Sequence, residues 1–207
     1  MAAARRDGVG QPARASSIPD SGNDRDELER TIARVAVAHV FGVDGKSTQL
    51  RELWRSAPTV TGFVRHYGCI FCHEMADGLL SIAPSIRHAG AQLALIGNGS
   101  VEQARRFYLH RGPPREGVHV LTDPERQSYD AAGFERSFTR TFLDGDSRRA
   151  YSRARSGGFR ITGWFGDLTQ LGGVIVTRPP CTPAYLYRSR FAGDHPELAE
   201  VLRALAL

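Results

Sequence analysis

The chain has 207 residues, 41% of them hydrophobic and 24% charged, which is ordinary for a globular domain able to bury a sizeable core. No apolar run approaches the roughly eighteen residues that a membrane span needs. The net charge is +5, and basic residues are scattered along the chain apart from one cluster at residues 148–155, so composition does not favour nucleic acid as a partner. We expect this cluster to be a solvated surface, with an anionic ligand or partner as the alternative.

The N-terminal residues 1–27 are rich in Ala, Arg, Gly, Pro and Ser and contain no apolar h-region. We therefore expect a disordered tail rather than a secretory signal. The expected location is the cytoplasm, where thiols are normally kept reduced. We expect one domain over residues 28–207.

The first elements of this domain are short. A valine-rich run over residues 34–41 predicts a strand, and Ser47 predicts the start of a helix. Residues 59–64 are a compact β-branched run and predict a buried strand. Two cysteines three positions apart, Cys69 and Cys72, follow this strand.

The middle of the chain alternates between helices and strands. Residues 72–88 have helical spacing that Pro84 should interrupt. The almost wholly apolar run at residues 91–96 predicts a strand buried on both faces of a parallel sheet. Ser100 is a suitable N-cap for a helix over residues 101–110.

The last third adds a strand at residues 118–121, a helix ending near Ala132, an irregular stretch over residues 134–169, a hairpin within residues 173–188 and a helix over residues 195–207. This order predicts an α/β sandwich with a central mixed β-sheet flanked by helices. The cysteine pair then lies at the carboxyl edge of the sheet, where such folds place their sites.

The sequence Cys69-Ile-Phe-Cys72-His permits a redox dithiol, half of a zinc site or a haem attachment site. Zinc would need further ligands, and the third cysteine, Cys181, stands more than a hundred residues away. Covalent haem attachment generally requires export and a distal ligand, which the sequence does not offer. The redox interpretation is favoured, and we expect neither a metal nor a cofactor.

A redox dithiol needs a thiolate, and a helix N-terminus lowers the pKa of a thiol placed there. Cys69 would occupy that position, and we expect Arg65 and His66 to add positive potential around it. Cys72 lies one turn further on the same helix face and could form the disulfide with Cys69.

Residues 62–74, GFVRHYGCIFCHE, resemble the FVRHxGCxxCRE signature of the peroxiredoxin-like branch of the AhpC/TSA antioxidant superfamily, which includes prostaglandin F synthase-type reductases. The resemblance runs from about Val40 to the C-terminus and implies a thioredoxin-like fold with thiol-dependent reductase or peroxidase activity. Further segments match in the same order: Asp44-Gly45, Leu93–Gly99, Leu121–Pro124, Gly166–Gly173 and Tyr187–Pro196.

The chain also departs from that family's pattern. The PxxxTxxC motif of peroxiredoxins is absent, and Cys69 takes the Thr position if Cys72 is aligned with the peroxidatic cysteine. That alignment favours Cys72 as the nucleophile, whereas exposure at the helix end favours Cys69. We prefer Cys69. The thioredoxin cis-proline is replaced by Leu171-Gly172.

The arginine that typical peroxiredoxins carry before their late strand falls at Gln170 or Leu171, and we expect Arg65 and His66 to stand in for it. Residues 134–169 hold many aromatic side chains and could form a lid suited to a bulky organic substrate; ordinary packing is the alternative. From the end of this segment we expect substrate contacts by four residues: Trp164, Phe165, Gln170 and Leu171.

Together these features predict a thiol-dependent oxidoreductase that reduces a peroxide, an endoperoxide or another organic electrophile and is restored by a thioredoxin-like dithiol. We expect no nucleic-acid or membrane partner and allow for a homodimer. Cys181 is expected to be structural or incidental, with a redox role between subunits as the alternative. Two alternatives remain: a tailoring enzyme of specialised metabolism with the same dithiol, and a non-catalytic redox sensor or binding module.

Overall fold

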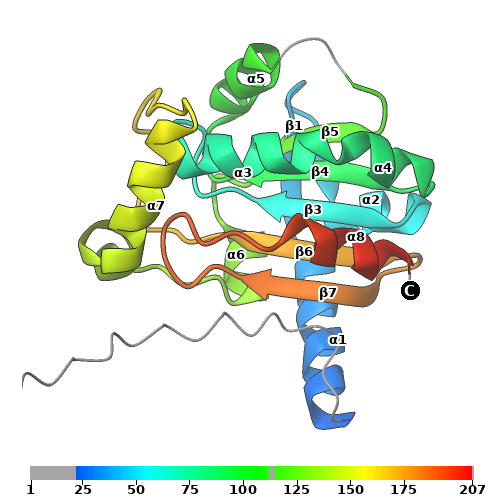
Figure 1. Ribbon diagram of the computed structural model, residues 1–207. Helices are drawn as coiled ribbons and strands as arrows, with labels where there is room; N and C mark the ends of the chain where they lie inside the picture. Colours follow the sequence, from blue (N-terminus) through cyan, green and yellow to red (C-terminus); the bar gives the residue numbers. More distant parts are fainter. Residues whose placement is uncertain (1–21, 112–114, 207) are drawn as a thin grey trace, which may run out of the picture.

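One mixed sheet of seven strands forms the centre of the protein in a computed structural model, which describes residues 22–111 and 115–206 (Figure 1). The strands lie in the order β2-β1-β5-β4-β3-β6-β7. Their bounds are His39–Gly42 (β1), Ser47–Gln49 (β2), Thr59–Phe63 (β3), Gln92–Gly97 (β4), Val118–Thr122 (β5), Gly173–Arg178 (β6) and Thr182–Arg188 (β7).

The three central strands β3, β4 and β5 are parallel, whereas β1 and β2 on one side and β6 and β7 on the other are antiparallel to their neighbours. The parallel strands all end at the same edge. The sequence prediction of an α/β fold with a mixed sheet is therefore confirmed.

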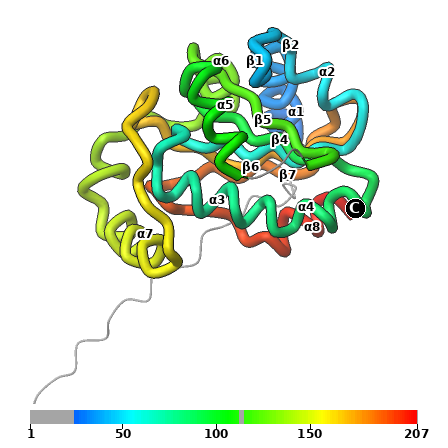
Figure 2. Tube along the Cα trace, turned by 90° about the horizontal axis from the view of Figure 1, so that it is seen from above, coloured from blue at the N-terminus to red at the C-terminus, as the bar shows by residue number. Residues whose placement is uncertain are grey.

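Helices cover both faces of the sheet (Figures 1 and 2). Helices α3, α4, α5, α7 and α8 pack in one hydrophobic core, and α1, α2 and α6 in the other. Their bounds are Gly22–Ala36 (α1), Leu50–Ser56 (α2), Ile70–Ser81 (α3), Ala83–His88 (α4), Val101–His110 (α5), Gln127–Ala132 (α6), Gly145–Ser156 (α7) and Leu198–Ala206 (α8), with a π-helical turn, η1, at Thr139–Leu143.

Strand β4 shows why residues 93–96 form an unbroken apolar run. Leu93 and Leu95 point into one core, and Ala94 and Ile96 point into the other. Because both faces of the sheet are covered, both sets of side chains are removed from water.

The N-terminal part of the domain differs from the prediction. Of the expected tail over residues 1–27, residues 1–21 lie outside the described residues, and α1 already begins at Gly22. This helix continues to Ala36, so the predicted strand at residues 34–41 shrinks to β1. The reason is burial: Leu28, Ile32 and Val35 recur at helical spacing and pack into the core.

The stretch over residues 134–169 was predicted to be irregular, which is wrong for its first half, where η1 and α7 form. The side chain of Asp144 caps α7 by accepting from the amides of Asp146 and Ser147. Two smaller corrections concern Ser47, which begins strand β2 rather than a helix, and the last helix, which begins at Leu198. Within the described ranges, none of the helices is long and apolar enough to cross a membrane.

Candidate active site

The loop between β3 and α3 is held in place by two buried tyrosines. The hydroxyl of Tyr129 donates to the carbonyl oxygens of Val64 and Ile96, at 2.6 and 2.8 Å. The hydroxyl of Tyr67 accepts the amide of Gly97 at 2.9 Å. These bonds tie the loop to the carboxyl end of β4, so the residues that follow it are rigidly placed.

Cys69 is the N-cap residue of α3, as expected. Its carbonyl oxygen accepts the amides of Cys72 and His73, at 3.1 and 3.0 Å. Both thiols are free and largely buried, with 5% of Cys69 and 2% of Cys72 exposed. Of the two, Cys69 lines a cavity and Cys72 does not.

Arg65 lies against the thiol of Cys69. Its Nη1 is 3.5 Å from the sulfur, while Nε donates to the carbonyl oxygen of Gln170 at 2.9 Å and Nη2 to that of Leu168. Arg65 is buried, and within the described part of the chain no carboxylate makes an ion pair with it. A buried guanidinium without a counter-anion favours the anionic form of the acidic group that it touches.

The two thiols differ in acidity because the Cys72 thiol donates a hydrogen bond to Cys69, which favours the thiolate on Cys69 and disfavours it on Cys72. Burial raises the pKa of Cys69, but the hydrogen bond from the Cys72 thiol, the charge of Arg65 and the amides of Cys72 and Phe71 outweigh it and bring this pKa to about 6. Burial and the neighbouring Cys69 raise the pKa of Cys72 well above its ordinary value. At neutral pH the pair therefore carries one thiolate, on Cys69.

His66 plays a different part from the one predicted. Burial and the charge of Arg65 lower its pKa to about 3, so it is neutral at pH 7 and adds no positive potential. Its amide donates to the sulfur of Cys72 at 3.4 Å, and its Nδ1 accepts the amide of Gly68 at 3.3 Å. The charge of the site therefore comes from Arg65 rather than from both residues.

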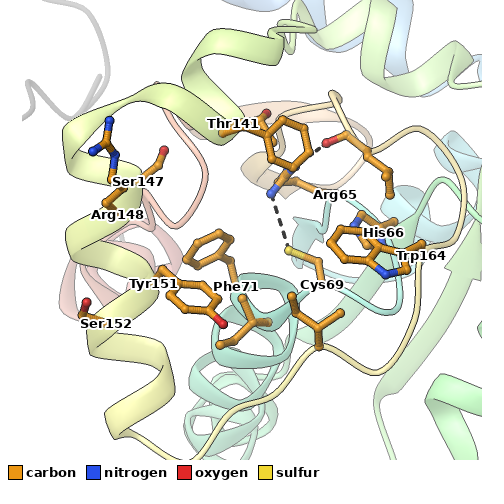
Figure 3. Close-up of a pocket in the computed structure, with 14 residues that line it drawn as sticks. Arg65, His66, Cys69, Phe71, Thr141, Ser147, Arg148, Tyr151, Ser152 and Trp164 are labelled. Carbon is orange, nitrogen blue, oxygen red and sulfur yellow. Dashed lines mark hydrogen bonds between the residues drawn. The ribbon is translucent and has the colours of Figure 1, made fainter.

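A cavity of about 490 Å³ opens in front of Cys69 (Figure 3). Arg65, His66 and Cys69 form its inner wall, and η1, α7 and the segment after α7 form the outer wall. Most of the lining is apolar. The remaining lining residues are Ile70, Phe71, Thr141, Phe142, Ser147, Arg148, Tyr151, Ser152, Ile161, Trp164 and Leu168.

The four predicted substrate contacts are divided by the structure. Trp164 lines the cavity of Cys69, whereas Phe165 lines a neighbouring cavity of about 420 Å³. Gln170 and Leu171 are fully buried and, among the described residues, belong to the lining of neither, so the structure does not bring them to these cavities. Gln170 acts instead through its backbone carbonyl, which holds Arg65.

Tyr151 lines the cavity as part of the aromatic segment predicted as a lid, whereas the polar lining residues Thr141 and Arg148 were not predicted. A signal for Arg148 exists, because it shares one face with Tyr151 and Ser152 at helical spacing. It becomes visible only once α7 is recognised as a helix. Nothing in the sequence marks Thr141.

The segment after α7 crosses the start of α3 (Figure 2). The amide of Thr162 donates to the carbonyl oxygen of Gly68 at 3.0 Å, and a Cβ on Gly68 would lie 2.1 Å from the oxygen of Gly163. Glycine at position 68 therefore permits the close backbone approach that shapes this end of the cavity.

Gly68→Ala is expected to lower the free energy of unfolding by about 1–3 kcal/mol, because two backbone segments must separate to admit the methyl group. Chemical denaturation measures the effect. Gly145→Ala is the matched control, since its Cβ would meet Arg149 at 3.9 Å, an ordinary contact. Equal stability of the two variants would contradict the close approach at Gly68.

A family model described as AhpC/TSA antioxidant enzyme matches residues 78–190. The matched segment begins after the cysteine pair and contains the four strands β4, β5, β6 and β7. It therefore identifies the scaffold without including the two thiols.

Similar proteins include the chloroplastic thioredoxin-like protein AAED1 of Arabidopsis thaliana, 28% identical over 80% of this chain and 68% of its own length. Human peroxiredoxin-like 2C is 29% identical over 93% of this chain and 85% of its own. The prostamide/prostaglandin F synthase of Salmo salar is 29% identical over 79% and 82%.

Among solved structures, reduced Prx3 of Vibrio vulnificus in complex with hydrogen peroxide superposes with a TM-score of 0.59 at 14% identity, over 82% of this chain and 94% of that one. At this identity the likeness concerns the fold. It agrees with the thioredoxin-like architecture expected from the sequence.

Proposed function

The chain belongs to the AhpC/TSA antioxidant enzyme family, and we propose that it is a thiol-dependent oxidoreductase whose nucleophile is Cys69. The observation that carries this proposal is the contact between Cys69 and the buried guanidinium of Arg65, which favours a thiolate in the wall of an otherwise apolar cavity. The family supports a redox function for this chain. The reaction proposed below is inferred from the geometry of the site.

In the proposed reaction the Cys69 thiolate attacks one oxygen of a peroxide, ROOH. A sulfur–oxygen bond forms and the oxygen–oxygen bond breaks, which oxidises Cys69 to a sulfenic acid and reduces the peroxide to an alkoxide. The alkoxide takes up a proton and leaves as the alcohol, ROH. Arg65 lies close enough to Cys69 to stabilise negative charge that develops on these oxygens.

Cys72 resolves the sulfenic acid. Its sulfur attacks the sulfur of Cys69, the disulfide forms, and the hydroxyl group leaves with the Cys72 proton as water. Cys72 lies one turn along α3 from Cys69, and each thiol shifts the pKa of the other. An external thioredoxin-like dithiol then reduces the disulfide by thiol–disulfide exchange and becomes a disulfide itself, so the cycle balances.

The lining of the cavity favours an organic substrate over hydrogen peroxide, because apolar side chains form most of its wall. The same observation supports the second candidate, a tailoring enzyme that uses this dithiol on one particular organic molecule. The cytoplasmic location and the homodimer both stay predictions.

The test is stopped-flow oxidation of the reduced protein by hydrogen peroxide and by cumene hydroperoxide, followed by turnover with thioredoxin. We expect faster oxidation by the organic hydroperoxide. Oxidation by both no faster than that of a free thiol would contradict the peroxidase and favour the tailoring enzyme. Stoichiometric oxidation without turnover would indicate a sensor.

Thr141 offers a polar contact to the substrate. It is 6% exposed, lines the cavity, and its hydroxyl has no hydrogen-bond partner among the described residues. Thr141→Val is expected to leave thermal stability unchanged or higher, while raising KM for cumene hydroperoxide about threefold to tenfold through one lost hydrogen bond.

Thr177→Val is the matched control, because Thr177 is also buried without a hydroxyl partner but lies in β6, outside the cavity. Its KM should equal that of the wild type. A rise in KM in both variants, or in neither, would remove Thr141 from the substrate site.

A further inference from the structure

Large apolar side chains are exposed mainly in one part of the surface. Eight such side chains are exposed in the described residues, and six of them belong to residues 138–164. Four of the six also line the cavity, so they share one opening. The six are Phe138, Phe142, Leu143, Tyr151, Ile161 and Trp164.

Most of the excess positive charge lies in the same segment. Residues 138–164 contain six arginines and two aspartates, a net charge of +4, against +5 for the whole chain. Arg148, Arg155 and Arg160 are exposed and make no ion pair with any described carboxylate; Arg148 and Arg160 donate to backbone carbonyls. Three cations are thus available beside the apolar side chains.

These groups occupy one side of α7 and the segment that follows. Arg148, Tyr151 and Ser152 line the cavity, and Arg155 continues that helical face one turn later. Arg160 immediately precedes Ile161, another lining residue. We define the rim face as the exposed side chains of residues 138–164 around the cavity opening.

We propose that the rim face docks onto the surface of an anionic lipid bilayer. Exposed aromatic and aliphatic side chains flanked by arginines suit the boundary between headgroups and acyl chains, and each arginine near such a surface adds attraction. This attachment lies on the bilayer without spanning it, and it replaces the expectation that the chain has no membrane partner. It goes beyond the redox proposal and does not depend on it.

A second copy of the chain is a poorer occupant of the rim face. A symmetric contact would place this basic surface against itself, and like charges brought together without counter-charges repel. A bilayer supplies both the negative headgroups and an apolar layer. Docking would turn the opening of the cavity toward the acyl chains.

Trp164 makes the proposal testable with the whole protein. The chain has two tryptophans, of which Trp54 is fully buried and Trp164 is 62% exposed. Vesicles of phosphatidylcholine with 30% phosphatidylserine should shift the emission of Trp164 to shorter wavelength and sediment the protein. Pure phosphatidylcholine should do neither, and added salt should weaken the binding.

Replacing Arg148, Arg155 and Arg160 together by glutamine is expected to lower the partition coefficient about tenfold to a hundredfold. The double variant Phe138→Ala, Leu143→Ala should also lower the partition coefficient, because two apolar side chains no longer insert among the acyl chains. Each variant has a matched control at exposed side chains outside the rim face. Replacing Arg30, Arg87 and Arg203 together by glutamine controls for the loss of charge, and Val37→Ala with Leu109→Ala controls for the loss of apolar side chains. Both controls should bind like the wild type.

Three results would overturn the proposal: no binding to the phosphatidylserine vesicles, binding without a change in Trp164 emission, or equal losses in rim and control variants. Any of these would leave an acidic protein surface as the better occupant of the rim face. Circular dichroism checks that each variant is folded, and every substitution is at an exposed position.

Discussion

Cys69→Ser is expected to lower the rate of hydroperoxide reduction about a thousandfold or more, because the hydroxyl of serine does not ionise at neutral pH and is a poor nucleophile toward a peroxide. The wild-type thiol is mostly ionised there, since its pKa is about 6. Stopped-flow measurement of the reduced protein against cumene hydroperoxide gives the rate directly.

Cys72→Ser should behave differently. Its Cys69 should still be oxidised once, to a sulfenic acid that dimedone traps, but disulfide formation and turnover with thioredoxin should be lost. Cys181→Ser is the matched control and should react like the wild type, since Cys181 lies in the turn between β6 and β7. If Cys72→Ser lost the first oxidation and Cys69→Ser retained it, the two roles would have to be exchanged.

Arg65→Met should slow alkylation of Cys69 by iodoacetamide at pH 6.5 about tenfold or more, with the rates converging as the pH rises above 9. Removing the guanidinium takes away the charge that favours the thiolate, so the pKa of Cys69 rises. A lower thiolate fraction lowers reactivity only below that new pKa. Mass spectrometry of the labelled peptide separates Cys69 from Cys72 and Cys181.

Two further variants make this test specific. Arg148→Met removes another arginine of the same cavity that makes no contact with Cys69, and its pH profile should match the wild type. Arg65→Lys keeps the charge but cannot reach the sulfur and two carbonyl groups together. The pH profile of Cys69 alkylation in Arg65→Lys should lie between those of the wild type and Arg65→Met. A wild-type pH profile in Arg65→Met would show that the Cys72 thiol and the amides at the helix start acidify Cys69 without Arg65.

The elements that the sequence predicted well have their signals within a few neighbouring residues. The apolar run of β4 must be buried on both faces wherever it lies, and Ser100 caps α5 through the amide of Gln103, at 3.3 Å. The break between α3 and α4 follows from Pro84. Such signals do not depend on what packs against them.

The elements that were missed depend on contacts between distant residues. The first three residues of the valine-rich run, 34–36, join α1 because the helix buries Leu28 and Ile32 against the sheet, which outweighs the strand preference of that run. Helix α7 buries little more than Ala150 and Ala154, so its arginine-rich sequence shows no clear apolar stripe.

The reactive centre shows the same division. The fold class, the two cysteines at the start of α3 and the nearness of Arg65 follow from the sequence alone, since only three residues separate Arg65 from Cys69. Three features of the site needed the folded structure: burial makes His66 neutral, the carbonyl oxygens of Leu168 and Gln170 hold Arg65, and Thr141 and α7 enclose the cavity. Local signals specify which groups are present, but desolvation and contacts across a hundred residues specify their charge and what they face.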